Sequence, residues 1–199
     1  MKKFFTSAWF KCIAVLLSIA LVSGGLLAIL NDVLYVSAEV RTMRAITKIY
    51  GEEKEYSVVL DVDGTDENKK TAYICEDFGT ISKIYVIGEK TSGEFDYLFK
   101  ATGEHGYKNG TVSLWIQVKV SGGEQKIEKV ILDGFTKQTL MSKLGSSYYD
   151  EFAEDFNGEY FSAKEEKDKT YAPVSGATYS ATAANNAVNC VIFWLRGNV

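Results

Sequence analysis

The chain has 199 residues, of which 46% are hydrophobic and 24% charged, and its formal net charge is -4 at pH 7. This composition is typical of a folded protein and excludes an intrinsically disordered one. A net negative charge argues against nucleic acid as the main partner, because phosphate backbones are bound by an excess of Lys and Arg.

An apolar segment lies near the N-terminus. Lys2, Lys3 and Lys11 precede an uncharged run from Cys12 to Leu30. A helix of this length spans a hydrocarbon layer, and the leading lysines place the N-terminus in the cytoplasm. We therefore expect residues 1–31 to form a single-pass anchor in the cell membrane, with the main domain on the extracytoplasmic side.

A cleaved signal peptide is the alternative interpretation of this segment. Val36-Ser37-Ala38 offers small residues to a peptidase, and cleavage there would leave Glu39 as the first residue. We favour a retained anchor because the apolar run is long and ends well before this site. Residues 32–51 are then expected to continue the helix close to the membrane, with Gly51 as its stop.

Residues 52–199 are expected to form one α+β domain with a mainly antiparallel sheet and a C-terminal helix. Gly-rich turns separate several of its strand-like runs, which favours a meander. In the first run, Ile81, Lys83, Tyr85 and Ile87 are expected on one face. The four runs are 81–87, 95–99, 112–120 and 127–132. A short helix, 146–156, is expected to pack its aromatic residues into the core.

The segment Val58-Val59-Leu60-Asp61-Val62-Asp63-Gly64-Thr65 resembles the first motif of haloacid-dehalogenase phosphotransferases. That resemblance implies Asp61 as nucleophile, Asp63 as acid/base and a magnesium ion. The chain lacks the alternating strand and helix units of a parallel sheet, and a wholly polar run follows. We therefore predict a hairpin turn at Asp63-Gly64 and keep the phosphotransferase as a less favoured alternative.

The cysteines and the single histidine offer no obvious reactive site. Cys12, Cys75 and Cys190 are too far apart in sequence for a zinc cluster, and their odd number excludes a complete disulfide framework. Cys190 is predicted to be a small buried apolar residue. His105 lies in a glycine-rich turn and is predicted to be a surface residue, which leaves a hydrolase without its base.

The most informative segment is residues 172–181, which contain the only proline and end where a helical pattern begins. Helix N-termini favour phosphate groups, because their first N–H groups lack partners and the helix dipole attracts negative charge. Gly176 and Ala177 leave the backbone accessible, and Thr178 presents a hydroxyl. The simpler interpretation is that Thr178 caps the helix.

Ser175-Gly176-Ala177-Thr178, followed by Ser180, resembles the flavinylation motif of the FMN-binding domain family. That family includes the G subunit of Rnf electron-transport complexes and the C subunit of sodium-pumping NADH:quinone reductase. The resemblance implies that a transferase moves FMN from FAD onto Thr178 as a phosphoester. The family commonly has Asp three positions before the serine, whereas this chain has Ala172.

Two more segments resemble this family. The segment from Gly106 to Gly110 is similar to its Gly-Tyr-Gly-Gly turn, and the region 135–141 corresponds to a loop near the flavin, although the Pro-Gly of that loop is lacking. Thr139 and Leu140 are therefore further cofactor-binding candidates.

The resemblance implies an anchored electron-transfer subunit with covalent FMN, in an Rnf-type or related complex. It would have membrane redox subunits with flavin or iron–sulfur centres as partners, and a flavin transferase for maturation. The alternative is a non-catalytic anchored binding or assembly module.

Overall fold

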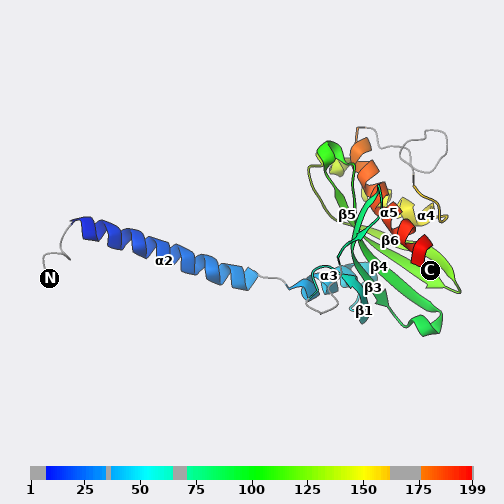
Figure 1. Ribbon diagram of the computed structural model, residues 1–199, viewed down its shortest axis with the longest axis horizontal. Coiled ribbons are helices and arrows are strands. Elements are labelled where there is room, and N and C mark those ends of the chain that lie inside the picture. The colour runs from blue at the N-terminus through cyan, green and yellow to red at the C-terminus, as the bar shows by residue number, and fades with distance from the viewer. Residues whose placement is uncertain (1–7, 35–36, 65–70, 162–175, 199) are drawn as a thin grey trace. The chain divides into compact units, whose positions relative to one another are not determined.

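A computed structural model describes residues 8–34, 37–64, 71–161 and 176–198 (Figure 1). Contacts between residues divide the chain into two compact units, residues 1–41 and 42–199. Ser175 and the rest of the approach to the C-terminal helix lie outside the described residues.

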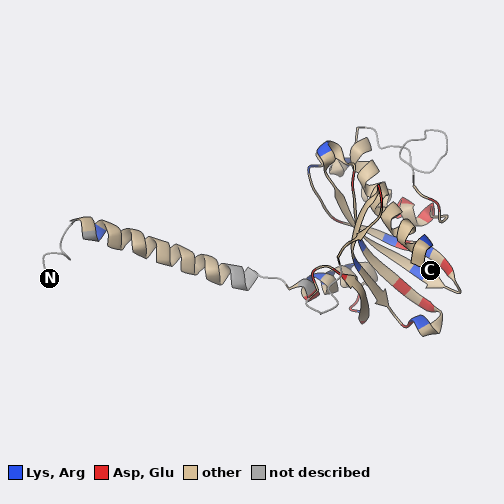
Figure 2. Ribbon diagram, viewed as in Figure 1, with Lys and Arg blue, Asp and Glu red and all other residues tan. Residues whose placement is uncertain are grey.

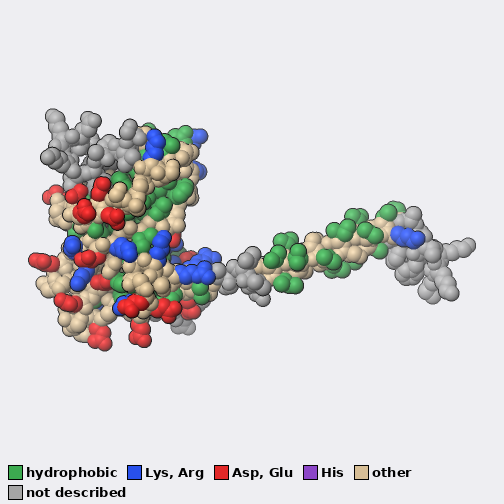
Figure 3. Space-filling view, turned by 180° about the vertical axis from the view of Figure 1, so that it is seen from behind, with side chains coloured by type: hydrophobic (Ala, Val, Ile, Leu, Met, Phe, Trp, Pro, Cys, Tyr) green, Lys and Arg blue, Asp and Glu red, His purple; other side chains and the backbone are tan. Residues whose placement is uncertain are grey.

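The first unit contains one long apolar helix, α2 (Ala8–Leu34). Its stretch Lys11–Leu30 is long and apolar enough to cross a membrane. Figure 3 shows hydrophobic side chains exposed along this helix. The hydroxyls of Ser18 and Ser23 donate to backbone oxygens one turn earlier, at 2.7 Å each, so these polar groups are satisfied within the helix.

A second helix, α3 (Ala38–Tyr50), follows α2, so the expected continuous helix to Tyr50 is wrong. Ser37 is the physical reason for the new start. Its Oγ accepts a hydrogen bond from the N–H of Val40 at 3.3 Å, and its carbonyl accepts one from Arg41 at 3.1 Å, as at a helix N-cap. Gly51 ends α3 with a positive φ of 79°, as predicted.

The second unit is built on an antiparallel sheet. Its strands are β1 (Tyr56–Asp61), β2 (Tyr73–Ile74), β3 (Gly79–Ile87), β4 (Glu94–Gly103), β5 (Val112–Ser121) and β6 (Glu124–Phe135). The order is β1-β3-β4-β5-β6, and β2 also pairs with β3. The four strand-like runs are thus confirmed as β3 to β6. Between β5 and β6, Gly122 and Gly123 both have positive φ, as a two-residue hairpin turn requires.

Two details of the sheet differ from the prediction. Asp63-Gly64 is not a hairpin turn, because β1 and β2 both pair antiparallel with β3 and therefore lie along the same edge. The register of β3 against β4 shifts between Ile81 and Lys83, which indicates a β-bulge. Ile81 consequently joins the core with Ile84 instead of facing the same way as Lys83 and Tyr85.

Helices cover both faces of the sheet. α5 (Thr178–Asn198) lies across β3, β4 and β5, and α4 (Ser146–Glu154) lies near β6 (Figure 1). Figure 2 shows that α5 carries almost no charged residues, as expected for a core helix. On the opposite face, Ile46 and Ile49 of α3 pack against Leu98 and Trp115. Because α5 packs along β3, β4 and β5, its N-terminus is positioned by the sheet.

The contact between α5 and β4 is unusually close at Gly103. A Cβ placed on Gly103 would lie 1.9 Å from the carbonyl oxygen of Ala183 and 2.3 Å from the nitrogen of Ala187. Only glycine allows the two backbones to approach this closely. This contact fixes the depth at which α5 sits on the sheet.

Candidate functional site

The candidate site is built around the N-terminus of α5. The first helical hydrogen bond runs from the N–H of Ala181 to the carbonyl of Ala177, at 2.9 Å, so Ala177 occupies the N-cap position and Thr178 is the first helical residue. Alanine has no side-chain acceptor for the first N–H groups. Thr178 is exposed, and among the described residues its hydroxyl has no hydrogen-bond partner. Thr178 therefore does not act as the N-cap of α5, and helix capping gives its hydroxyl no role.

Gln138 joins three segments that are far apart in sequence. Its Oε1 accepts hydrogen bonds from Ser180 Oγ at 3.0 Å and from the N–H of Tyr107 at 3.2 Å, and its Nε2 donates to the carbonyl of Thr136 at 3.2 Å. Gln138 and Ser180 are both buried. The first turn of α5, the turn at Gly106–Gly110 and the loop at 135–141 are therefore tied together at one place.

Two glycines make this arrangement possible. A Cβ on Gly106 would lie 2.2 Å from Gln138 Nε2, and one on Gly110 would lie 2.2 Å from the carbonyl oxygen of Thr136. Neither position tolerates a larger residue, because the nearest atoms belong to the hydrogen-bonded loop itself. The turn and the loop can meet only where these two residues are glycine.

An open pocket of about 380 Å³ lies beside the N-terminus of α5. Its walls include Tyr107 and Tyr179, whose ring centroids are 6.3 Å apart with an interplanar angle of 58°. Both rings are substantially exposed, and Tyr179 directly follows Thr178. Exposed aromatic rings at a pocket mouth provide a surface on which a planar ring system stacks.

Lysines lie near these segments: Lys108 in the turn, Lys137 in the loop, and Lys143 just after the loop. A Cβ on Gly176 would lie 2.6 Å from the Nζ of Lys143, so that ammonium lies close to Gly176, while Lys137 borders Gly110. Lys108 lines the pocket. In a chain with a net charge of -4, this local group of lysines favours an anion. Gly176 has a φ of 82°, a conformation that glycine adopts without strain.

The predicted site residues are only partly brought together. Thr178, Ala177 and Gly176 form the start of α5, and Ser180 is linked to the 135–141 loop through Gln138. Thr139 and Leu140 are exposed in that loop, without a described contact to Thr178. Gln138 and Lys143 were not predicted, because nothing in the local sequence pattern marks a loop glutamine as buried or a lysine as adjacent to a distant helix.

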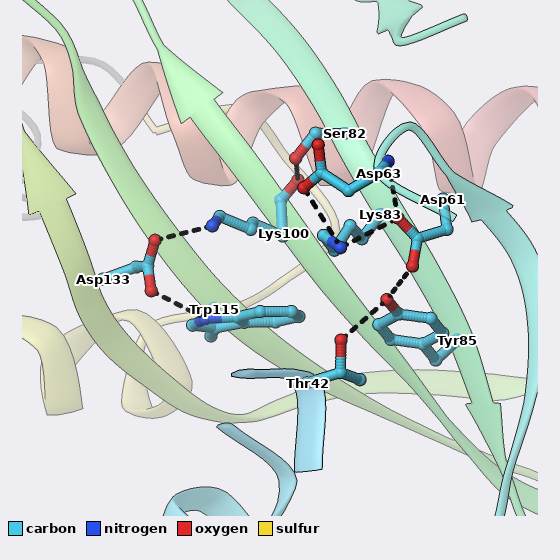
Figure 4. Close-up of polar contacts among 9 residues, drawn as sticks. All are labelled: Thr42, Asp61, Asp63, Ser82, Lys83, Tyr85, Lys100, Trp115 and Asp133. Carbon is cyan, nitrogen blue, oxygen red and sulfur yellow. Dashed lines mark hydrogen bonds and ion pairs between the residues drawn. The ribbon is translucent and has the colours of Figure 1, made fainter. Parts of the chain in front are cut away.

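Asp61 and Asp63 belong to a different place, on the face of the sheet covered by α3 (Figure 4). Asp61 accepts hydrogen bonds from Lys83 Nζ at 2.8 Å and from the hydroxyl of Tyr85, which is 3.1 Å from the hydroxyl of Thr42. Burial alone raises the pKa of Asp61, but the hydrogen bonds from Lys83 and Tyr85 outweigh it and hold the pKa below its usual value.

These contacts give Asp61 a structural role. Both of its oxygens are engaged by neighbouring side chains. In the described parts of the chain, no group of three or more His, Cys, Asp or Glu is placed to hold a metal ion. His105 is exposed, as predicted, and its Nε2 lies 2.9 Å from the carbonyl oxygen of Asp77.

Fold and site together define an α+β domain in which the turn at residues 105–109 and the first turn of α5 line an exposed pocket, with the 135–141 loop joined to both through Gln138. No family model matches this chain, and neither a curated protein nor a solved structure shows significant similarity to it.

Proposed function

We propose that this protein is a membrane-anchored electron-transfer flavoprotein with FMN esterified to Thr178. The observation that carries the proposal is the convergence at Gln138. The three segments that resemble the FMN-binding domain family are the motif at 175–180, the Gly106–Gly110 turn and the 135–141 loop. They are distant in the chain, yet they are hydrogen-bonded to one another.

The residues of the site suit a phosphate ester. The first N–H groups of α5 point away from the helix without intrahelical acceptors, and the positive end of the helix dipole lies at the same place. Lys143 adds a cation beside Gly176. An exposed hydroxyl at Thr178 is accessible to an enzyme. The attacking oxygen would replace AMP on the flavin-side phosphorus of FAD and lose its proton, which leaves FMN attached.

The protein's own residues would then hold and orient the flavin. The bound FMN would supply the redox chemistry. Tyr107 and Tyr179 provide ring surfaces at the pocket, and Gln138 keeps the turn that carries Tyr107 close to α5. A covalent ester prevents loss of the cofactor by dissociation.

The location of the domain is part of the proposal. We place α2 across the cell membrane with the N-terminus in the cytoplasm and residues 42–199 outside. The apolar stretch Lys11–Leu30 supports a span, and the preceding lysines support its orientation. Outside the cytoplasm, electrons would come from and pass to other membrane redox subunits with flavin or iron–sulfur centres, in an Rnf-type or related complex.

The proposal is tested by co-expressing the chain with a flavin transferase and measuring its intact mass. We expect a mass increase equal to FMN minus one water, and a fluorescent band in a denaturing gel. An unmodified mass would favour a non-catalytic anchored binding or assembly module. A phosphotransferase would instead show magnesium-dependent phosphatase activity that is lost in Asp61→Asn.

Replacing Gln138 with leucine is expected to lower both stability and flavin incorporation. The change leaves Ser180 Oγ and the N–H of Tyr107 without their acceptor, and an unsatisfied buried polar group costs about 1–3 kcal/mol. Urea denaturation and flavin fluorescence measure the two effects. Gln117→Leu is the control, because Gln117 donates to Asp96 elsewhere on the sheet. Unchanged flavin incorporation in Gln138→Leu would contradict the positioning role.

A further inference from the structure

Two cysteines separated by 115 positions meet in the core of the second unit. Cys75 directly follows β2, and Cys190 lies in the middle of α5. The Sγ of Cys75 is 3.6 Å from the carbonyl oxygen of Cys190, and both side chains are fully buried. Both are thiols in the structure. Backbone hydrogen bonds at 2.9 Å from Cys75 to Gly79 and from Phe78 to Cys75 hold the first cysteine in a tight turn.

We propose that Cys75 and Cys190 form a disulfide when the chain folds in an oxidising compartment. The two thiols lose two protons and two electrons as the sulfur–sulfur bond forms. The electron acceptor is the disulfide of a thiol oxidoreductase or of glutathione, which is reduced to two thiols. Cys12 remains single, in α2 of the other unit, so the odd number of cysteines is compatible with one internal bridge.

The observation behind this proposal is the direct contact between the two residues in the core. A disulfide requires Cα atoms within about 7 Å of each other and Cβ atoms that face one another. The Sγ of Cys75 already lies 3.6 Å from the backbone oxygen of Cys190, and the neighbouring Cys75 thiol, together with burial, raises the pKa of the Cys190 thiol. Neutral, buried thiols react slowly, because the thiolate is the nucleophile. The bond must therefore form before α5 closes over the sheet, and once formed it is shielded from reductants.

Such a bridge would join two parts of the domain that lie far apart in sequence. Cys75 belongs to the edge of the sheet at β2, and Cys190 belongs to the helix whose first turn carries Thr178. A cross-link that closes a loop of this length restricts the unfolded chain strongly. For a unit of this size, we expect the thermal midpoint of unfolding to rise by roughly 10 °C. The bond does not require the flavin, so it can be tested on unmodified protein.

The test uses the full chain in detergent, unfolded with reductant and refolded in a mixture of reduced glutathione and glutathione disulfide. The protein is then denatured, alkylated with iodoacetamide and mapped by mass spectrometry. We expect a single alkylated cysteine, Cys12, and a linked peptide pair that contains Cys75 and Cys190. Alkylation of all three cysteines, or a bridge that includes Cys12, would overturn the assignment.

Variants provide a second, independent readout. Cys75→Ala is expected to leave Cys12 and Cys190 open to alkylation and to make the thermal midpoint insensitive to reductant. Cys12→Ala is the matched control and should keep both the bridge and the reductant-sensitive midpoint. If the midpoint of the unaltered chain refolded in the glutathione mixture equals that of the fully reduced chain, no stabilising bridge has formed and the proposal fails.

Discussion

Thr178→Ala is expected to abolish covalent flavin incorporation while leaving the fold intact. Thr178 is exposed and its hydroxyl lacks a partner among the described residues, so its removal breaks no hydrogen bond within that part of the chain. Alanine also favours the helix, and the expected change in the free energy of unfolding is within about 0.5 kcal/mol. The variant and the unaltered chain should be co-expressed with a flavin transferase and compared by intact mass, gel fluorescence and urea denaturation.

The control for this variant lies one turn further along the same helix. Thr182→Ala removes a hydroxyl that donates to the carbonyl of Thr178 at 2.9 Å, so it tests a local structural effect without removing the proposed attachment oxygen. It should retain flavin. Retention of the flavin mass by Thr178→Ala would place the ester on another residue and refute the assignment. Loss of flavin in both variants would indicate a local structural effect, which the denaturation curves would reveal.

Much of the fold was predictable from local patterns. The alternation of apolar and polar residues in β3 to β6 predicted a meander, because each strand buries a face against α4 or α5 and each connection is short. The apolar periodicity from Ala181 to Leu195 predicted α5 for the same reason. Such elements can be predicted because their apolar residues recur at a fixed spacing within one short segment, on the face that becomes buried.

Features that depend on distant contacts were not predictable. The bulge at Ile81 changes which residues of β3 face the core, and Ser37 starts a new helix where a continuous one was expected. Gln138 is buried only because Ser180 and Tyr107 approach it from other segments. The resemblance located the three segments of the candidate site in sequence, but it did not provide the hydrogen bonds that join them.

Lys83→Met is expected to cost far more stability than Lys100→Met, although the two lysines are cross-strand neighbours with similar ion pairs. The Nζ of Lys83 is 2.8 Å from Asp61, and the Nζ of Lys100 is 2.9 Å from Asp133 (Figure 4). The difference is burial, since the Lys83 side chain is 5% exposed and that of Lys100 is 27% exposed. Removing one partner of a buried pair costs about 3–5 kcal/mol, whereas an exposed pair contributes at most about 1 kcal/mol.

The pH dependence separates loss of the ion pair from a simple packing defect. The lowered pKa of Asp61 contributes stability that is present above about pH 4 and is lost as the pH falls through the folded-state value. Lys83→Met removes a main cause of that lowered pKa, so its deficit should be largest near neutral pH and should shrink in acid. Urea denaturation at neutral pH and below pH 4 measures this change. A deficit that is the same at both pH values would mean that Lys83 acts through its methylene groups alone, and that the charge on Asp61 does not help to hold the sheet in place beneath α3.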